Sequence, residues 1–171
     1  MLILLVLIII AATFSIASFV GAPYVPILRR DSEALLSLAD LKPGQTLIDL
    51  GSGDGRLLRA AAARGIRGIG YEINPIMIAI SRLVCWRYRH LITIHLADFW
   101  QTKLPPADVV YVFLLPKYML KLDQHLANQI HQPTRLISYA FEIPDKPSLI
   151  RTRNTFVYEY GTQIAAPSLN N

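Results

Sequence analysis

The chain has 171 residues and a formal net charge of +5 at neutral pH, and 53% of its residues are hydrophobic while only 17% are charged. Soluble domains carry about 25% charged residues, so this composition excludes intrinsic disorder and is unlike a typical soluble surface. The length fits one domain, or one domain with an appendage. No Asp, Glu, Lys or Arg occurs before Arg29, so the whole net charge belongs to the residues from Arg29 to Asn171.

The beginning of the chain is an apolar segment. Residues 1–20 carry no charge, and only Thr13, Ser15 and Ser18 interrupt the apolar run. As a helix with a rise of about 1.5 Å per residue, the segment spans roughly 30 Å, the thickness of a bilayer core. The pattern predicts a transmembrane helix. A cleaved signal peptide and a buried core helix are the alternatives, and a signal peptide would have a basic start and a shorter apolar run.

The charges that flank this segment predict its orientation. Nothing basic precedes it, and Arg29 and Arg30 follow it. By the positive-inside rule, the rest of the chain lies on the cytoplasmic side, or on the equivalent inner side of an organelle membrane. The only cysteine, Cys85, allows no intrachain disulfide, which fits a reducing compartment. We therefore expect a single-pass membrane protein whose domain faces the cytoplasm.

Residues 21–30 separate the apolar segment from the rest of the chain. Pro23 and Pro26 make this stretch stiff and extended, because proline disfavours helix at its own position and at the residue before it. Tyr24 suits a membrane–water interface. The pattern is typical of a short membrane-exit linker.

Helix and strand patterns alternate along residues 31–164, which we expect to form one domain, followed by a loose polar tail at 165–171. Four helices are predicted, at 31–40, 56–64, 75–89 and 117–130. Six strands are predicted, at 46–50, 66–73, 92–97, 109–115, 135–141 and 155–160. Alternation of this kind implies right-handed crossovers and a mostly parallel, doubly wound α/β sheet covered on both faces.

A glycine-rich turn, Asp-Leu-Gly-Ser-Gly-Asp-Gly at 49–55, joins the first predicted strand to its helix. Ligands of doubly wound sheets bind at turns of this kind. A dinucleotide fingerprint would need its third glycine where Arg56 stands, and the Gly-Lys-Ser/Thr ending of a phosphate-binding loop is missing. Asp49 and Asp54 favour a cationic ligand over a pyrophosphate. S-adenosylmethionine carries a sulfonium and an amino group, so it is the predicted cofactor, with these binding residues in the turn: Asp49, Gly51, Ser52, Gly53, Asp54 and Gly55.

Carboxylates also follow the next two predicted strands. Glu72 closes the second strand, about twenty residues after the turn, and can accept hydrogen bonds from both ribose hydroxyls. Asp98 ends the third strand and can accept from an adenine amino group, while an adjacent aromatic ring packs on the base. Each feature alone has an ordinary alternative: the glycines could form a simple tight turn, Glu72 could be a solvated carboxylate, and Asp98 could be a helix cap or turn residue. Together they predict a cofactor site that also includes Ile73, Asn74, Phe99 and Trp100.

Five motifs give the chain its resemblance to a known family. It resembles class I S-adenosylmethionine-dependent methyltransferases, and more narrowly the small membrane-anchored protein-lysine methyltransferases of mitochondria. Those enzymes modify the c-type subunit of ATP synthase and the adenine nucleotide translocase. The resemblance runs from about Pro23 to about Tyr160 and rests on the stretches at 23–26, 48–56, 70–75, 98–100 and 112–116.

The resemblance implies a Rossmann-like class I methyltransferase fold and roles for several residues. The turn at 49–55 would hold the methionine part of the cofactor, Glu72 the ribose, and Asp98 with its neighbours the adenine. The residues expected to border the methyl acceptor are Leu114, Leu115, Pro116 and Tyr118. The residues that would cover the cofactor as a lid, instead of serving only as a linker, are Tyr24, Val25 and Pro26.

The resemblance also implies the activity, which is methylation of a lysine side chain of a membrane protein. A lipid or quinone-like acceptor and a non-catalytic, cofactor-binding membrane module are the alternatives. The chain is shorter than the better-known members, and its apolar run begins at residue 1 without a basic targeting stretch. We therefore expect a prokaryotic inner membrane as its location, and the mitochondrial substrates do not carry over.

The sequence does not single out a catalytic residue. A lysine acceptor must lose a proton, since its ordinary pKa is about 10.4, and an apolar pocket would favour that loss. Glu142, after the fifth strand, is a possible acceptor-site acid without an assigned catalytic role. No metal is expected, because the histidines lack metal-ligand spacing: His90, His95, His125 and His131.

The basic balance of the chain, with a sequence pI near 9.5, fits attraction to anionic lipids or to nucleic acid. Methyltransferases that act on exocyclic base amines usually carry Asn/Asp-Pro-Pro-Tyr/Phe after the fourth strand. Residues 114–117 read Leu-Leu-Pro-Lys instead. Together with the predicted anchor, this difference makes nucleic acid an unexpected partner.

Overall fold

The computed structural model describes residue 1 and residues 29–161. Its helices are α2 (Arg29–Ala39), α3 (Arg56–Ala62), α4 (Pro75–Val84) and α5 (Met119–Ala127). Three short 3-10 helices are η1 (Trp86–Tyr88), η2 (Phe99–Gln101) and η3 (Pro116–Tyr118). The strands are β1 (Thr46–Leu50), β2 (Arg67–Glu72), β3 (Ile92–Leu96), β4 (Val109–Val112), β5 (Thr134–Tyr139), β6 (Ile150–Arg151) and β7 (Thr155–Tyr160).

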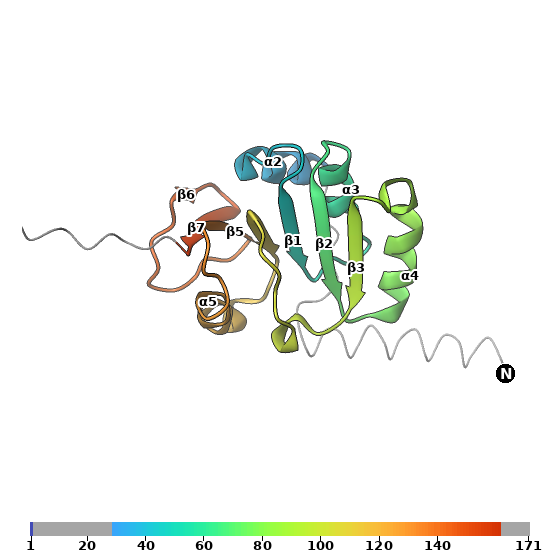
Figure 1. The fold of residues 1–171 in the computed structure, drawn as a ribbon. Helices are drawn as coiled ribbons and strands as arrows, with labels where there is room; N and C mark the ends of the chain where they lie inside the picture. The colour runs from blue at the N-terminus through green and yellow to red at the C-terminus, as the bar shows by residue number, and fades with distance from the viewer. Residues whose placement is uncertain (2–28, 162–171) are drawn as a thin grey trace, which may run out of the picture.

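The strands form a single sheet in the order β3-β2-β1-β4-β5-β7-β6 (Figure 1). The first five are parallel to one another, whereas β7 is antiparallel to both β5 and β6. The predicted mostly parallel α/β sheet is therefore confirmed. The chain winds outward from β1 toward β3 and then crosses to β4 on the other side of β1. In open α/β sheets, this reversal marks the edge where ligands bind.

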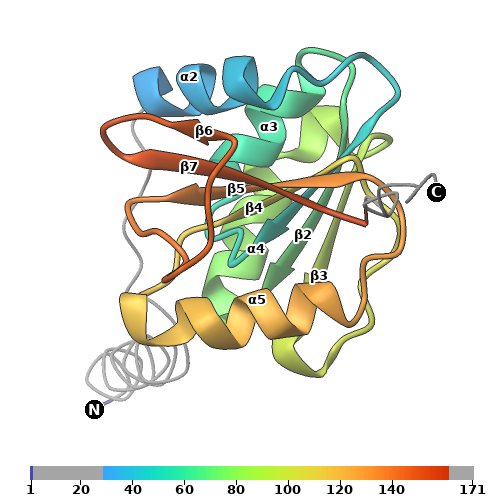
Figure 2. The same ribbon diagram turned by 90° about the vertical axis from the view of Figure 1, so that its left-hand side faces the viewer.

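Helices cover both faces of the sheet, and Figure 2 shows α2 and α3 on one face and α5 on the other. Successive strand residues alternate between these faces, as the pleat requires. Leu47 packs with the cluster that contains α2 and α3 side chains, whereas Ile48 packs with the cluster that contains α5 side chains. A third cluster joins α4 to α3 and β3 through Ile78, Leu58 and Ile94. The two-sided burial explains why the strands are continuous apolar runs.

Several boundaries differ from the sequence-based expectation. The helix expected at 75–89 ends at Val84, because Cys85 (φ −90°, ψ 1°) leaves the helical region and η1 follows. The strand expected at 109–115 ends at Val112, since Leu115 already caps η3. The two-residue strand β6 was not predicted, because so short a run carries no periodicity.

Some predictions concern residues that the structure does not describe. The predicted anchor at 2–20 and the possible lid residues Tyr24, Val25 and Pro26 lie outside the described residues, as does the tail from 162 onward. Arg29 and Arg30, which were expected in the linker, belong to α2. Within the described part, no helix is long and apolar enough to cross a bilayer.

Candidate cofactor site

The glycine-rich turn bends back onto the end of the neighbouring strand. The backbone N–H groups of Gly51 and Ser52 both donate to the carbonyl of Tyr71 on β2, at 2.9 Å each. Gly51 has φ +93° and Gly55 has φ +75°, a region that L side chains rarely adopt. A side chain at Gly55 would also meet the Cys85 sulfur at 2.8 Å. The sequence therefore needs glycine here to place the start of α3 at the carboxyl end of β1.

Glu72 ties together the turns that follow β1 and β2. The N–H of Gly53 donates to its Oε2 at 2.9 Å, and the N–H of Asn74 donates to its Oε1 at 2.8 Å. The residue is only 9% exposed. Because a carboxylate offers about four lone-pair sites, two backbone donors leave capacity for further hydrogen bonds. Glu72 thus has both a structural role and room for a ligand hydroxyl.

The two residues after Glu72, Ile73 and Asn74, have different roles at this edge of the sheet. The Asn74 side-chain oxygen caps α4, accepting from the N–H groups of Ile76 at 2.9 Å and Met77 at 3.4 Å. Ile73 is 37% exposed, so it presents an apolar surface beside a buried carboxylate. This combination suits a ligand with a polar ribose and a flat apolar base.

Asp49 is buried on β1, with Gly70 of β2 and Tyr111 of β4 as its neighbours in the sheet. Burial raises the pKa of its carboxyl to about 8, and the nearby carboxylates of Glu72 and Asp54 act in the same direction. A neutral Asp49 is therefore favoured near neutral pH in the absence of a cation. A ligand cation at this place would reverse that preference.

Buried polar atoms without a partner gather around this edge. Within the described residues, four buried side-chain polar atoms have no hydrogen-bond partner: Asp49 Oδ1, Ser52 Oγ, Asn74 Nδ2 and Tyr111 OH. More than 90% of buried polar groups in folded proteins are paired, so such a group needs an explanation. Three of the four belong to residues predicted to bind the cofactor. The fourth, Tyr111, stands directly opposite Asp49 on the adjacent strand.

Tyr111 is the residue that sequence reasoning missed. Burial raises the pKa of its hydroxyl well above the ordinary value, and the Asp49 carboxylate adds to this effect. The signal that could have found Tyr111 is the register of β4 against β1, since Asp49 pairs with Tyr111. That register joins residues 62 positions apart, and nothing local in the sequence specifies it.

Asp54 offers a ligand less negative charge than the sequence indicated. Its carboxylate is held by Arg56, whose Nη2 lies 2.7 Å from Oδ2 and whose Nε lies 3.0 Å from Oδ1. Its negative charge is therefore partly neutralised by a neighbour in the chain. That Asp49 and Asp54 act together on a cation stays a prediction, and of these two acids only Asp49 is buried.

Asp98 caps the short helix η2. Its Oδ1 accepts from the N–H of Trp100 at 3.0 Å, and its Oδ2 accepts from the Gln101 side chain at 2.9 Å. The cap was one of the alternatives for this residue, and it does not exclude a further bond to a ligand. Phe99 is buried in the core. The Trp100 ring packs against Phe99 at 4.6 Å between centroids, and the Lys121 ammonium lies 4.2 Å from the centre of the Trp100 ring.

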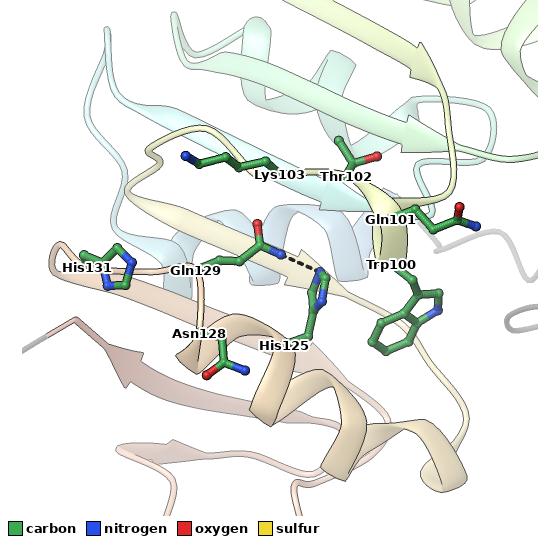
Figure 3. Close-up of a pocket in the computed structure, with 8 residues that line it drawn as sticks. All are labelled: Trp100, Gln101, Thr102, Lys103, His125, Asn128, Gln129 and His131. Atoms are coloured by element: carbon green, nitrogen blue, oxygen red, sulfur yellow. Dashed lines mark hydrogen bonds between the residues drawn. The ribbon is translucent and has the colours of Figure 1, made fainter.

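A hollow of about 460 Å³ opens beside Asp98, between η2 and α5 (Figure 3). Trp100 and Gln101 line it on one side, with His125 and Gln129 on the other, and a 2.8 Å hydrogen bond joins the last two. Burial lowers the pKa of His125. Of the predicted cofactor residues, only Trp100 lines this hollow. The hollow is thus separate from the turn that carries Asp49 and Glu72.

The predicted acceptor-site residues follow β4 at the same edge of the sheet. Leu114 is 3% exposed, and Leu115 and Pro116 lead into η3. The Tyr118 ring lies 6.3 Å from that of Trp100, which brings the end of η3 next to η2. Glu142 forms an exposed ion pair with Arg151 at 3.1 Å, while its neighbour Phe141 stacks on Phe113, which follows β4, at 6.2 Å between ring centroids.

Comparison with known proteins points to one group of enzymes. Residues 49–149 match the family described as the ANTKMT methyltransferase domain. The human lysine N-methyltransferase of the ATP synthase c-type subunit is 32% identical over 124 residues, which are 71% of this chain and 53% of that protein. The adenine nucleotide translocase lysine N-methyltransferase of Mus musculus is 37% identical over 125 residues, covering 71% of this chain and 54% of that protein.

A shorter relative comes from Saccharolobus islandicus (strain REY15A). This protein-lysine N-methyltransferase is 30% identical over 125 residues, covering 71% of this chain and 78% of that protein. The chain spans about half the length of the human and mouse relatives. The match therefore concerns the domain that these proteins share.

Solved structures support the same fold. An RNA methyltransferase from Salinibacter ruber, in complex with S-adenosyl-L-homocysteine, superposes with a TM-score of 0.73 and 30% identity. The superposition covers 84% of this chain and 97% of that one. An S-adenosylmethionine-dependent methyltransferase from Geobacter sulfurreducens has a TM-score of 0.61, 21% identity and coverages of 79% and 58%, and shows the fold alone.

Proposed function

The chain belongs to the ANTKMT methyltransferase domain family, and we propose that it methylates a lysine side chain of a membrane protein. Three lysine methyltransferases with 30–37% identity support the lysine acceptor. The observation that carries the proposal is the group of unpartnered polar atoms around the glycine-rich turn. These atoms lie around the turn that follows β1, the kind of place where open α/β sheets bind their ligands.

S-adenosylmethionine is the cofactor, and the residues of the turn fit it. The free Oδ1 of Asp49 would accept from the ammonium of the methionine part. Glu72 keeps lone pairs for the ribose hydroxyls, next to the unpartnered amide of Asn74. Ile73 offers an apolar surface to one face of the adenine, and Asp98 can accept from its amino group.

Methyl transfer needs alignment more than acid–base chemistry. When bound, the cofactor supplies a methyl group on a positively charged sulfur, which is a good leaving group. The chain contributes by holding cofactor and acceptor in line and by excluding water. Leu114, Leu115 and Pro116 would border the acceptor with apolar groups. Such surroundings lower the pKa of a lysine ammonium and favour the neutral amine that can attack.

The proposed location of the acceptor rests on the first part of the chain. The uncharged run at 1–20 would anchor the domain to a membrane, and Arg29 and Arg30 would keep it on the cytoplasmic side. A domain held in this way meets lysines of membrane proteins near the bilayer surface. A prokaryotic inner membrane is the proposed location.

An RNA acceptor is the second candidate function. The Salinibacter ruber protein, which is 30% identical and has nearly the same extent, is described as an RNA methyltransferase. The sequence pI near 9.5 also favours a polyanion. The Leu-Leu-Pro-Lys stretch at 114–117 and the predicted anchor favour the protein substrate over RNA.

The proposal can be tested with the full chain, methyl-labelled cofactor and membranes from a host that lacks this protein's own activity. We expect label in one or a few membrane-protein bands. Variants Glu72→Ala and Asp98→Ala should lose the label, whereas Glu159→Ala, which changes an exposed acid of β7, should retain it.

Other outcomes would contradict the proposal in distinguishable ways. Label in the lipid extract would replace the protein acceptor by a lipid or quinone-like one, and label in added total RNA would favour the second candidate. Tight cofactor binding without transfer to any fraction would identify a non-catalytic binding module.

A further inference from the structure

The outer side of α4 and η1 exposes large apolar side chains. Leu83 is 78% exposed, Trp86 is 62% exposed and Ile80 is 41% exposed. We call this surface the α4–η1 face and include in it the exposed arginines nearby, so that its members are Ile80, Arg82, Leu83, Trp86, Arg87 and Arg89. Scattered exposed apolar residues are normal, but an adjacent set on one helix indicates a partner.

The α4 helix is apolar on both sides. Its inner side buries Met77 and Ile78 against α3 and the sheet. Its outer side carries Ile76, Ile80 and Leu83 at the spacing of one helix face. A helix of a soluble domain normally has one apolar and one polar face, whereas a helix that is apolar all round is covered on both sides. The sheet covers only the inner side of α4.

The charged residues of this stretch of the chain have one sign. No Asp or Glu occurs between Glu72 and Asp98, a stretch that contains Arg82, Arg87 and Arg89. The Arg89 guanidinium lies 4.6 Å from the centre of the Trp86 ring. Tryptophan and arginine together are typical of a membrane–water interface, because the indole sits at headgroup level and the arginine binds lipid phosphates.

We propose that the α4–η1 face rests on an anionic membrane surface, with Leu83 and Trp86 entering the interface and Arg87 and Arg89 binding lipid phosphates. The aliphatic side chains favour lipid over nucleic acid, since they neither stack on bases nor bind phosphate. The unbroken positive charge favours anionic lipid over a second copy of the same face, which would be repelled. This contact is separate from the predicted anchor and does not depend on which acceptor is methylated.

The contact would also orient the cofactor edge, by which we mean the carboxyl edge of the sheet with the turn at 49–55 and Glu72. α4 runs along the β3 side of the sheet (Figure 1), and it begins directly after Glu72 and Asn74. In Figure 1 the axis of α4 runs roughly along the strands, so a domain that lies on this helix holds its strands roughly parallel to the bilayer surface, with β3 and the start of α4 nearest to it. An anchor alone would leave the domain free to rotate.

The two tryptophans of the chain, Trp86 and Trp100, allow a direct test. The full chain carrying Trp100→Phe reports on Trp86 alone, and the full chain carrying Trp86→Phe reports on Trp100 as the control. Each is reconstituted into vesicles of brominated phosphatidylcholine, with or without brominated phosphatidylglycerol. We expect strong quenching and a blue shift of Trp86 only when phosphatidylglycerol is present, and little change for Trp100.

Charge-reversal variants sharpen the test. Arg87→Glu with Arg89→Glu should return Trp86 quenching to the level seen in phosphatidylcholine. The matched change Lys103→Glu with Arg153→Glu, at exposed residues elsewhere on the domain, should leave quenching unchanged. Circular dichroism of each variant confirms that the domain is folded.

Three results would overturn the proposal. Trp86 that is shielded from aqueous quencher in detergent without lipid would mean that another segment of the chain covers this face. Shielding that grows with protein concentration would mean that a second copy covers it. Protection by single-stranded RNA, without quenching by brominated phosphatidylglycerol vesicles, would mean a nucleic-acid surface.

Discussion

The cofactor edge of the sheet and the α4–η1 face depart from normal burial in opposite directions. At the edge, polar atoms of Asp49, Ser52 and Asn74 are buried without a partner. On the α4–η1 face, Leu83 and Trp86 are exposed without a cover among the described residues. The first departure costs stability in the isolated domain, and the second leaves apolar surface in water that a partner can bury. Each is explained if the functional state includes a second component, which is a cationic polar ligand in one place and a membrane in the other.

The comparison predicts that substitutions at the two regions separate binding from stability. A residue of the cofactor edge should affect ligand affinity strongly, and some changes there should even stabilise the ligand-free domain. A residue of the α4–η1 face should affect neither folding nor cofactor affinity in solution.

Glu72→Ala should have the largest effect. It removes the acceptor of the Gly53 and Asn74 N–H groups and the expected ribose contacts, so we expect S-adenosylhomocysteine affinity to fall about 100-fold or more. Isothermal titration calorimetry measures the change. Glu72→Gln, which keeps one carbonyl acceptor, should lose less. An Ala variant that folds and binds as the unaltered chain does would show that the cofactor lies elsewhere.

Asp49→Asn should weaken cofactor binding and stabilise the ligand-free domain. The carboxylate that would pair with the cofactor ammonium is lost, and we expect a fall in affinity of roughly 10- to 100-fold. Because the pKa of Asp49 is about 8 in the folded domain and 3.8 ordinarily, folding at about pH 7 works against its ionisation. Removing that cost should raise the unfolding free energy by about 2–4 kcal/mol.

Thermal and urea unfolding of the unaltered chain and of the Asp49→Asn variant test the predicted gain in stability. A variant that is less stable than the unaltered chain would mean that Asp49 has a favourable partner in the ligand-free domain. Ser52→Ala, which removes another unpartnered atom of the turn without removing charge, is the matched control and should change stability far less.

Cofactor affinity should depend on pH through Asp49. The ligand-free domain holds a proton on this carboxyl below about pH 8, and a bound ammonium favours the carboxylate, so binding releases a proton. Affinity should therefore rise from about pH 6 to about pH 7.5, by at most about tenfold per unit. Without cofactor, the folded domain binds more protons than the unfolded chain between 3.8 and about 8, so its stability should fall as pH rises through that range.

Calorimetry in buffers of different ionisation enthalpy counts the released protons. The Asp49→Asn variant should show neither the proton release nor the stability slope. A slope that persists in this variant would assign the titration to a group other than Asp49.

Leu83→Ala should have the smallest effect on stability. The side chain is 78% exposed, so we expect a change in unfolding free energy within about 0.5 kcal/mol. The control is Ile78→Ala on the same helix, which is 4% exposed and should cost about 2–4 kcal/mol. A large loss for Leu83→Ala in the full chain without lipid would show that another part of the protein already covers this face.

The sequence signals that predict the cofactor edge are local. The turn at 49–55, Glu72 and Asp98 lie at or just after the ends of β1, β2 and β3, and parallel strands bring such ends to one edge of the sheet. Other features depend on distant parts of the chain or on side-chain geometry. The pairing of Asp49 with Tyr111 requires the register of β4, and the salt bridge of Asp54 with Arg56 requires the side-chain geometry of the turn.

The exposure of the α4–η1 face could not be predicted from the sequence either. The sequence at 75–89 predicts an apolar helix, but both of its sides are apolar, so periodicity does not tell which side meets the sheet. Only the packing of Met77 and Ile78 against the domain identifies Leu83 and Trp86 as exposed. The acid-free stretch between Glu72 and Asp98 is readable from the sequence, although its meaning depends on that exposure.

The most direct test of the proposed function is to identify the residue that receives the methyl group. Membranes are incubated with the full chain and labelled S-adenosylmethionine, the labelled protein is isolated, and its acid hydrolysate is separated into amino acids. We expect the label to elute as a methylated lysine and Glu72→Ala to abolish it. Label in any other amino acid, or in lipid or RNA alone, would contradict the proposed function.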